Sequence, residues 1–317
     1  MELDRGTLEA AHCWEQADVV PRRPQMTAFR RALRYHQARW REANGHPIGS
    51  QPIVPGDGKP ARPLGSRIPL DYARATGANF LTPATRAAVE ARLAAKERHQ
   101  MVDAQRLWAD LLSSMAMCCN LFGELAADLS LADRAVHRWW PGSPGQVVDV
   151  HFEHSPGRLD SAYLGNLSAL DAAVVLDLGQ GARGIIGVET TYHEYAKAET
   201  AKPTRLARYR EVATTSGAFV TDVADAVNGT PLLQIWLDHL LVLSMLQHVD
   251  GVWQWGRFVV VYPEGNSDIA EACDRYRALL VDPSTFVAVT LEELLAAGAL
   301  PDAAAASFRQ RYLPATT

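Results

Sequence analysis

The sequence predicts an α/β protein with three layers, in which a central mixed sheet of four to five strands lies between helices. Its 317 residues are 48% apolar, which is enough to bury a large core without disulfides or metals. Short apolar segments rich in β-branched residues are bounded by turn signals, as strands are. Longer segments with helical periodicity precede and follow them. Together these features give the central order helix, strand, strand, strand, helix, strand.

The N-terminal third is predicted to be helical and irregular, outside the sheet. The first residues are polar and end in Pro21-Arg22-Arg23-Pro24, which favours a flexible arm. A helix is expected over 27–43, followed by a Pro- and Gly-rich stretch over 44–70 of the kind that is usually functional or mobile. The expected organisation is a tail at 1–24 and a single domain at 25–317, with a helical and Pro/Gly-rich elaboration at 25–100 and the core at 101–317.

The core elements follow from the same signals. Thr82-Pro83 is a helix start. The turn Gly179–Gly184 fits G-x-G-x-x-G, but a strand follows it, so it is predicted as a hairpin turn without a phosphate site. The expected helices are 84–99, 101–129, 204–213, 231–248, 267–280 and 291–297, and the expected strands are 146–154, 170–177, 184–194, 257–262 and 286–289.

The predicted hairpin carries an acidic side chain on each strand. Asp171 begins one strand, and Glu189 interrupts the apolar run of the next. Side chains alternate faces along a strand, so Glu189 and Thr191 share a face, and Asp171 could converge with Glu189 on one point. An unpaired carboxylate in a buried strand is costly. Two such carboxylates at a sheet edge can hold a hard divalent cation such as Mg²⁺.

This pattern resembles the PD-(D/E)XK nuclease superfamily, whose motif is an Asp on one strand and Glu-x-Lys on the next. The resemblance is to a bacterial branch of that superfamily and extends from roughly Met26 to Leu313. It implies a restriction-endonuclease-like core for the three-layer fold. The matching segments are Arg106–Ser114, Cys119–Glu124, Tyr192–Glu194, Gln234–Trp236 and Asp238–Leu241.

The resemblance implies a phosphodiesterase that acts on DNA and depends on Mg²⁺ or Mn²⁺. Asp171 and Glu189 would hold the metal against the scissile phosphate. A backbone carbonyl often contributes in these enzymes, which points to Val188 as a further ligand. Glu124 could supply a third carboxylate if its helix packs across the hairpin, and Glu153 is a weaker candidate.

One position departs from the family motif, because Thr191 stands where the lysine belongs. Losing one preorganised electrostatic donor commonly costs about 10²- to 10³-fold in rate. Three explanations stay open: a basic residue reaches in from elsewhere, the site works without one, or the site is degenerate and only binds. The nearest basic residues in the sequence are Lys197, Lys202 and Arg205.

Three further polar residues of the matched segments are candidates for the cleft. His193 is expected to share the face of Glu189 and Thr191, either handling protons or serving as an ordinary polar residue at a strand end. Gln234 and His239 lie on an otherwise apolar helix. They point into the cleft, or Gln234 caps a neighbouring backbone group.

Basic residues offer phosphate contacts although the net charge is −5. Such contacts give salt-sensitive affinity with little dependence on nucleotide sequence, and a solvated helix face is the alternative. The candidates for DNA binding are Arg30, Arg31 and Arg34 in the first long helix and Lys197, Lys202, Arg205 and Arg208 after the hairpin.

The cysteines and the lengths of the apolar runs indicate which kind of protein this is. The four cysteines show neither a disulfide framework nor metal-ligand spacing, and Cys118 and Cys119 are expected to be small buried side chains. The N-terminus lacks an apolar signal core, and no apolar run is long enough to span a bilayer, so a cytoplasmic protein without membrane contact is expected. The oligomeric state is left open, a homodimer included.

Two functions are compatible with these sequence features. The first is a metal-dependent DNA nuclease with an altered site at Thr191. The second is a degenerate nuclease fold that binds nucleic acid or protein without catalysis. An intact site would bring Asp171 and Glu189 together, open to solvent and near basic groups. A degenerate site would splay them apart, neutralise them with arginines or cover them with residues 44–70.

Overall fold

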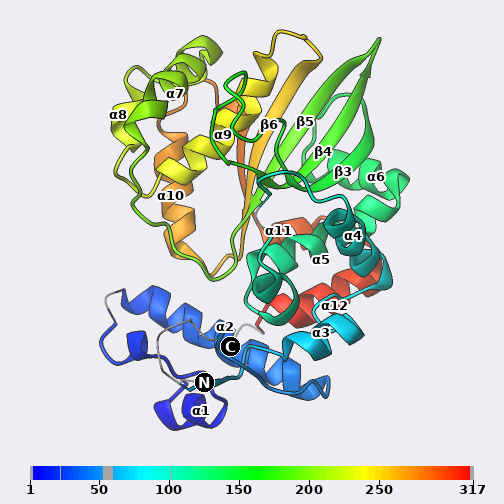
Figure 1. The fold of residues 1–317 in the computed structure, drawn as a ribbon, viewed down its shortest axis with the longest axis vertical. Coiled ribbons are helices and arrows are strands. Elements are labelled where there is room, and N and C mark those ends of the chain that lie inside the picture. The colour runs from blue at the N-terminus through cyan, green and yellow to red at the C-terminus, as the bar shows by residue number, and fades with distance from the viewer. Residues whose placement is uncertain (1–2, 22, 53–59, 101, 315–317) are drawn as a thin grey trace.

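The computed structural model describes residues 3–21, 23–52, 60–100 and 102–314. Within them, a five-stranded mixed sheet lies between two layers of helices (Figure 1). The strand order is β3-β4-β5-β6-β7, antiparallel from β3 to β5 and parallel from β5 to β7. The predicted three-layer α/β class is confirmed. The strands are β3 (Gln146–His154), β4 (Leu170–Gly179), β5 (Ala182–Thr190), β6 (Trp253–Tyr262) and β7 (Phe286–Thr290).

Apolar side chains alternate along the strands and form one core on each face of the sheet. Val174 and Ile186 belong to the first core, and Val175 and Ile185 belong to the second. The first face is covered by α5 (Ser114–Ala127), α6 (Leu129–Trp139), α11 (Leu291–Ala296) and α12 (Asp302–Tyr312), with α3 (Leu70–Thr76) and α4 (Pro83–Ala94) beyond them. The second face is covered by α7 (Pro203–Ser216), α8 (Val223–Val227), α9 (Leu233–Leu246) and α10 (Ser267–Arg277).

The N-terminal residues pack on the long helix α2 (Pro24–Ala43), at the bottom of Figure 1. The short helices α1 (Arg5–Ala10) and η1 (Gln16–Asp18) precede it, and Leu8 of α1 is fully buried. Asp18 is buried and forms ion pairs with two arginines of α2. A flexible arm was expected here from local polarity, but these long-range ion pairs anchor the described part of it.

Two other helical segments differ from expectation. The helix predicted over 101–129 is divided into η2 (Gln105–Ala109) and α5, because a neighbouring loop pairs with the residues between them. Arg67 forms an ion pair of 2.9 Å with Asp110, and Ser66 accepts a backbone hydrogen bond from Leu111. The C-terminal helix α12 was not predicted.

The remaining short elements are η3 (Pro283–Thr285) and the strand pair β1 (Gly49–Ser50) and β2 (Pro63–Leu64), which lies inside the Pro- and Gly-rich stretch. Residues 53–59 of that stretch fall outside the described residues. Cys118 and Cys119 are buried in α5, as predicted. Among the described residues, no helix combines the length and apolar composition needed to cross a bilayer.

Helix α9 approaches β5 closely at Gly187. A Cβ atom there would lie 2.7 Å from Val242 Cγ2 of α9 and 2.8 Å from Leu170 Cδ1. We expect Gly187→Ala to destabilise the fold by about 1–3 kcal/mol through overpacking, measured by urea denaturation. Gly184→Ala on the same strand is the matched control, because its Cβ would meet its nearest atom at 3.3 Å. Equal stability of the two variants would contradict this description of the α9–β5 contact.

Candidate active site

Three acidic residues lie near the ends of three neighbouring strands, Glu153 on β3, Asp171 on β4 and Glu189 on β5. In the β3–β4 ladder, Phe152 pairs with Ala172 and His154 pairs with Leu170, so Glu153 and Asp171 lie between these pairs. In the β4–β5 ladder the pairing ends with Ala172 and Val188, and Asp171 and Glu189 are the next residues of the two strands. The charge of Asp171 raises the pKa of Glu189, so the two acids lie within electrostatic reach of each other.

Asp171 sits at the sheet end between the two helical layers. Its Oδ2 accepts hydrogen bonds from Thr190 N at 2.9 Å and from Thr190 Oγ1 at 2.6 Å. Thr190 Oγ1 also lies 3.3 Å from the carbonyl oxygen of Ser114 on α5. Burial raises the pKa of Asp171, against the opposing effect of the Thr190 hydrogen bonds. No hydrogen bond among the described residues uses the other oxygen, Oδ1, so that oxygen is free to bind a ligand.

Glu189 faces a cavity of about 280 Å³, named here the inner cavity. It shares that cavity with Thr191, and it pairs in register with Val260 of β6 on the α9 side of the sheet. Burial raises the pKa of Glu189 well above its ordinary value, and the charges of Asp171 and Asp238 raise it further. A cation bound beside Glu189 would therefore relieve an electrostatic cost that the fold carries.

Asp238 of α9 is an acid of the inner cavity that the sequence analysis did not select. It is fully buried, and Gln234 donates a hydrogen bond of 2.8 Å to its Oδ2. Its Oδ1 has no partner among the described residues, and burial raises its pKa well above the usual value. Gln234 lines the same cavity. The signal in the sequence was an acid in the middle of a strongly apolar helix.

Glu153, the weaker candidate, ends β3 in the same row, with a φ of 49°. Burial raises its pKa to about 7, and the charge of Asp171 adds to the shift. Glu124 lies ten residues beyond Ser114 on α5, roughly 15 Å along the helix. It is not among the residues that line the inner cavity. Glu153 does not line that cavity either, but the charge of Asp171 acts on it, which supports Glu153 as the acid beside Asp171.

The pKa of Glu153 predicts how stability depends on pH. The folded state holds a proton that the unfolded chain releases near pH 4.5, so stability falls as the pH rises from about 4.5 to about 7. Glu153→Gln should remove this contribution and flatten the decline by an amount on the order of 2 kcal/mol. Urea denaturation at pH 5 and pH 8 measures it. A decline as steep as in wild type would mean that Glu153 ionises freely in the folded protein.

Val188 lies one residue before Glu189, inside the paired region of the sheet. It pairs with Ala172 on one side and Val259 on the other, and its side chain is buried in the first core. Thr191 continues the pairing beyond the strand end, where its N–H donates to Val261 O at 2.9 Å. The structure thus holds Val188 beside the acidic row, with its backbone between two neighbouring strands.

Arg106 of η2 places a positive charge near the acids. Arg106 Nη2 lies 3.5 Å from Glu194 Oε1 and 3.4 Å from Ser114 Oγ. Ser114 Oγ donates to Glu194 at 2.9 Å. Arg106 also acts to lower the pKa of both Asp171 and Glu153. Lys197 lines the inner cavity too, so two cations adjoin it.

His193 was expected on the face of Glu189, and His239 was expected to point into the cleft from its helix; the structure places both elsewhere. Strand β5 ends at Thr190, and His193 Nδ1 donates to Leu112 O at 2.9 Å, toward the α5 layer. His239 is fully buried, with its Nδ1 2.9 Å from Tyr276 Oη and its ring stacked on Phe258. Burial lowers the pKa of His239 to about 3. The cleft prediction for His239 was wrong, because that face of α9 packs into the second core.

The predicted DNA-binding residues fall into two groups. Arg34 is buried and pairs with Asp18 at 2.6 Å and with Glu15 at 3.2 Å, and Arg31 pairs with Asp18 at 3.1 Å. Arg208 donates to the carbonyl oxygens of Ala162 and Tyr163. The three arginines thus stabilise the fold through these ion pairs and hydrogen bonds. The prediction that Arg34 binds DNA was wrong, because its side chain is buried and paired. Lys202 and Arg205 lie at the start of α7, and Arg30 and Lys197 lie beside Tyr195.

Comparison with known proteins agrees with this geometry. A family model described as the PD-(D/E)XK nuclease superfamily matches residues 24–314. Searches of curated proteins and of solved structures gave no significant match. The matched region includes the whole sheet, both helical layers and the row of acids. The chain therefore belongs to the PD-(D/E)XK nuclease superfamily.

Proposed function

We propose that this protein is a phosphodiesterase that cleaves DNA with a divalent metal, Mg²⁺ or Mn²⁺, held by Asp171 and Glu189. The observation that supports the proposal is their position at adjoining ends of adjacent strands, with Glu189 lining the inner cavity and burial raising the pKa of both. Such a metal neutralises charge on the phosphate and lowers the pKa of a bound water. The backbone carbonyl of Val188 is a proposed additional ligand.

The donor set fits a magnesium ion. Among the described residues, no group of three or more His, Cys, Asp or Glu side chains is arranged to hold a metal. Mg²⁺ usually binds through one or two carboxylates and keeps water or substrate phosphate as its other ligands. The free Oδ1 of Asp171 and the carboxylate of Glu189 suit this mode. A nucleic-acid phosphate would complete the coordination.

The alternative of a degenerate binding module receives less support. Degeneracy predicts acids that are splayed apart, paired with arginines or covered by residues 44–70. Asp171 and Glu189 instead lie at adjoining ends of β4 and β5, and no salt bridge among the described residues engages either one. The described part of 44–70 does not line the inner cavity.

Arg106 is proposed to replace part of the charge that the motif lysine would supply at Thr191. Its guanidinium lies near the acids rather than on β5, and it is held by Glu194 and Ser114. An arginine is always charged and offers several N–H donors to a phosphate. This supports the first of the three explanations for the missing lysine, with a donor distant in sequence.

The proposed activity is tested by incubating supercoiled plasmid, linear duplex and single-stranded DNA with the protein. We expect cleavage with Mg²⁺ or Mn²⁺ and none in EDTA. Absence of cleavage of all three DNAs with either metal would overturn the catalytic proposal. Cleavage that persists in EDTA would overturn the metal requirement.

A further inference from the structure

We propose that Tyr195 is a stacking site for an unpaired nucleotide of single-stranded DNA, beside the acids of the inner cavity. The proposal rests on the proposed function, because it names the form of DNA that this site receives. Tyr195 is exposed, with 38% of its surface accessible to solvent. Three cations surround its ring within 6 Å, and the ring lines the cavity that contains Glu189.

The cations come from separate parts of the chain. Arg23 Cζ lies 5.4 Å from the ring centroid and Arg30 Cζ lies 5.8 Å from it, while Lys197 Nζ lies at 5.4 Å. Arg23 and Arg30 stand at the start of α2, and Lys197 follows β5. Among the described residues, no salt bridge engages Arg30 or Lys197. Their charge is therefore available to phosphates on either side of a stacked base.

Tyr195 joins two cavities. It lines the inner cavity of about 280 Å³ and also an outer cavity of about 760 Å³. The outer cavity is lined by Arg23 and Arg30 and by no acidic residue among those described. Its size lies within the range of roughly 300–1,000 Å³ typical of small-ligand pockets. It therefore suits an anionic nucleotide.

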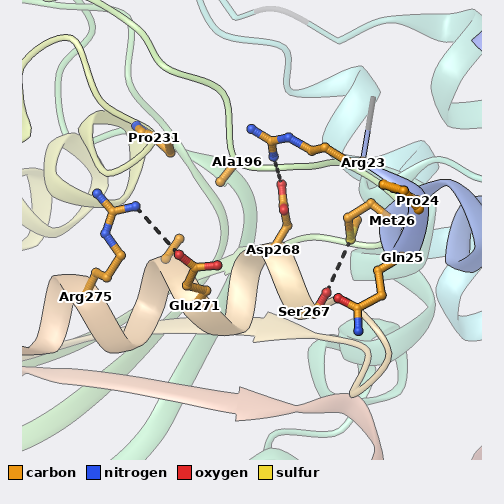
Figure 2. Close-up of a pocket in the computed structure, with 11 residues that line it drawn as sticks. Arg23, Pro24, Gln25, Met26, Ala196, Pro231, Ser267, Asp268, Glu271 and Arg275 are labelled. Atoms are coloured by element: carbon orange, nitrogen blue, oxygen red, sulfur yellow. Dashed lines mark hydrogen bonds and ion pairs between the residues drawn. The ribbon is translucent and has the colours of Figure 1, made fainter. Parts of the chain in front are cut away.

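A middle cavity of about 620 Å³, drawn in Figure 2, has lining residues in common with each of the other two. It shares Arg23 and Met26 with the outer cavity and Ala196 and Pro231 with the inner one. Arg23 pairs with Asp268 across it, as the dashed line in Figure 2 shows. The three cavities thus adjoin one another in succession, from the basic outer cavity to the inner cavity that Glu189 lines.

The exposed tyrosine ring together with its neighbouring cations favours single-stranded DNA over duplex DNA. A base can stack on a tyrosine ring only when it has left its own stack, and aromatic stacking contributes to binding without requiring a particular base. The ring of Tyr195 and its cations provide both elements of such a site, a π-face and charges for the backbone. In a duplex the same contacts would first require unpairing.

Binding without cleavage tests the inference. The probes are a fluorescein-labelled dT12 strand and a 12-base-pair duplex, measured by anisotropy in EDTA. Tyr195→Leu should weaken dT12 binding about 5- to 100-fold and leave duplex binding within about 2-fold, since stacking contributes about 1–3 kcal/mol per base. Tyr195→Phe, which keeps the ring, should bind as wild type does. Equal effects of Leu on strand and duplex, or no effect, would overturn the stacking site.

A second pair of variants replaces lysines rather than the aromatic ring, so it tests the site even if Tyr195→Leu fails to fold. Lys197→Ala should lower the salt dependence of dT12 binding by about one ion, and Lys96→Ala, an exposed lysine that lines none of the three cavities, should not. Identical salt slopes would overturn the role of Lys197. Cleavage assays separate the two proposals. If dT12 binding depends on Tyr195 but no DNA is cleaved, only the nuclease proposal is contradicted. If DNA is cleaved but dT12 binding does not depend on Tyr195, only the stacking site is contradicted.

Discussion

Glu189→Gln and Asp171→Asn are each expected to reduce metal-dependent cleavage at least about 1,000-fold. Each substitution removes a charged ligand and leaves the shape of the side chain unchanged, so the metal loses one of its two carboxylates. Cleavage rates on supercoiled plasmid with saturating Mg²⁺ measure the effect. Because burial already raises the pKa of both acids, the neutral variants should be at least as stable as wild type.

The matched control for this loss is Asp177→Asn. Asp177 lies on β4 like Asp171, but near the hairpin turn, where it forms an ion pair of 2.5 Å with Arg183. We expect this variant to cleave at the wild-type rate. If Asp177→Asn and Asp171→Asn lose activity equally, the row at the sheet end has no special part in catalysis.

Thr191→Lys is expected to raise the cleavage rate about 100-fold. Thr191 lines the inner cavity one alternation beyond Glu189, so a lysine there would direct an ammonium toward the bound phosphate. One preorganised donor of this kind contributes about 10²- to 10³-fold to a rate. Single-turnover rates on a labelled duplex and on dT12 measure the gain. An unchanged rate would mean that the cavity no longer has the geometry of a working motif.

Combination with Arg106→Ala tests whether Arg106 replaces the lysine. Arg106→Ala alone should lower the rate about 10- to 100-fold. If both residues supply the same charge, Thr191→Lys should recover most of that loss, and the two effects should be strongly non-additive. Additive effects would assign Arg106 a different role, such as holding Glu194.

Local pattern was sufficient to predict the parts of the fold that carry the acids. Strand β3 spans Gln146–His154 as expected, and the turn after β4 places residues 179, 180 and 181 at positive φ, as a Gly-rich hairpin turn requires. The same hairpin places Asp171 and Glu189 at adjoining strand ends. Residue type, alternation and turn length are all local in the sequence.

What could not be predicted depends on contacts between distant residues. Arg34 resembled a surface cation until Asp18 and Glu15 were found beside it. Arg106 reaches the acids only because η2 and α5 pack against the end of the sheet. Asp238 became a site residue through the close approach of α9 at Gly187. None of these contacts leaves a periodic signal.

Titration of the protein with Mn²⁺ at pH 8, followed by the electron paramagnetic resonance signal of free Mn²⁺, tests most directly whether the paired acids hold a cation. We expect one site in wild type, and weaker binding at pH 5.5, where protons compete for acids whose pKa is raised. The Asp171→Asn/Glu189→Gln double variant should leave the added Mn²⁺ free. A double variant that binds Mn²⁺ as tightly as wild type would contradict the account.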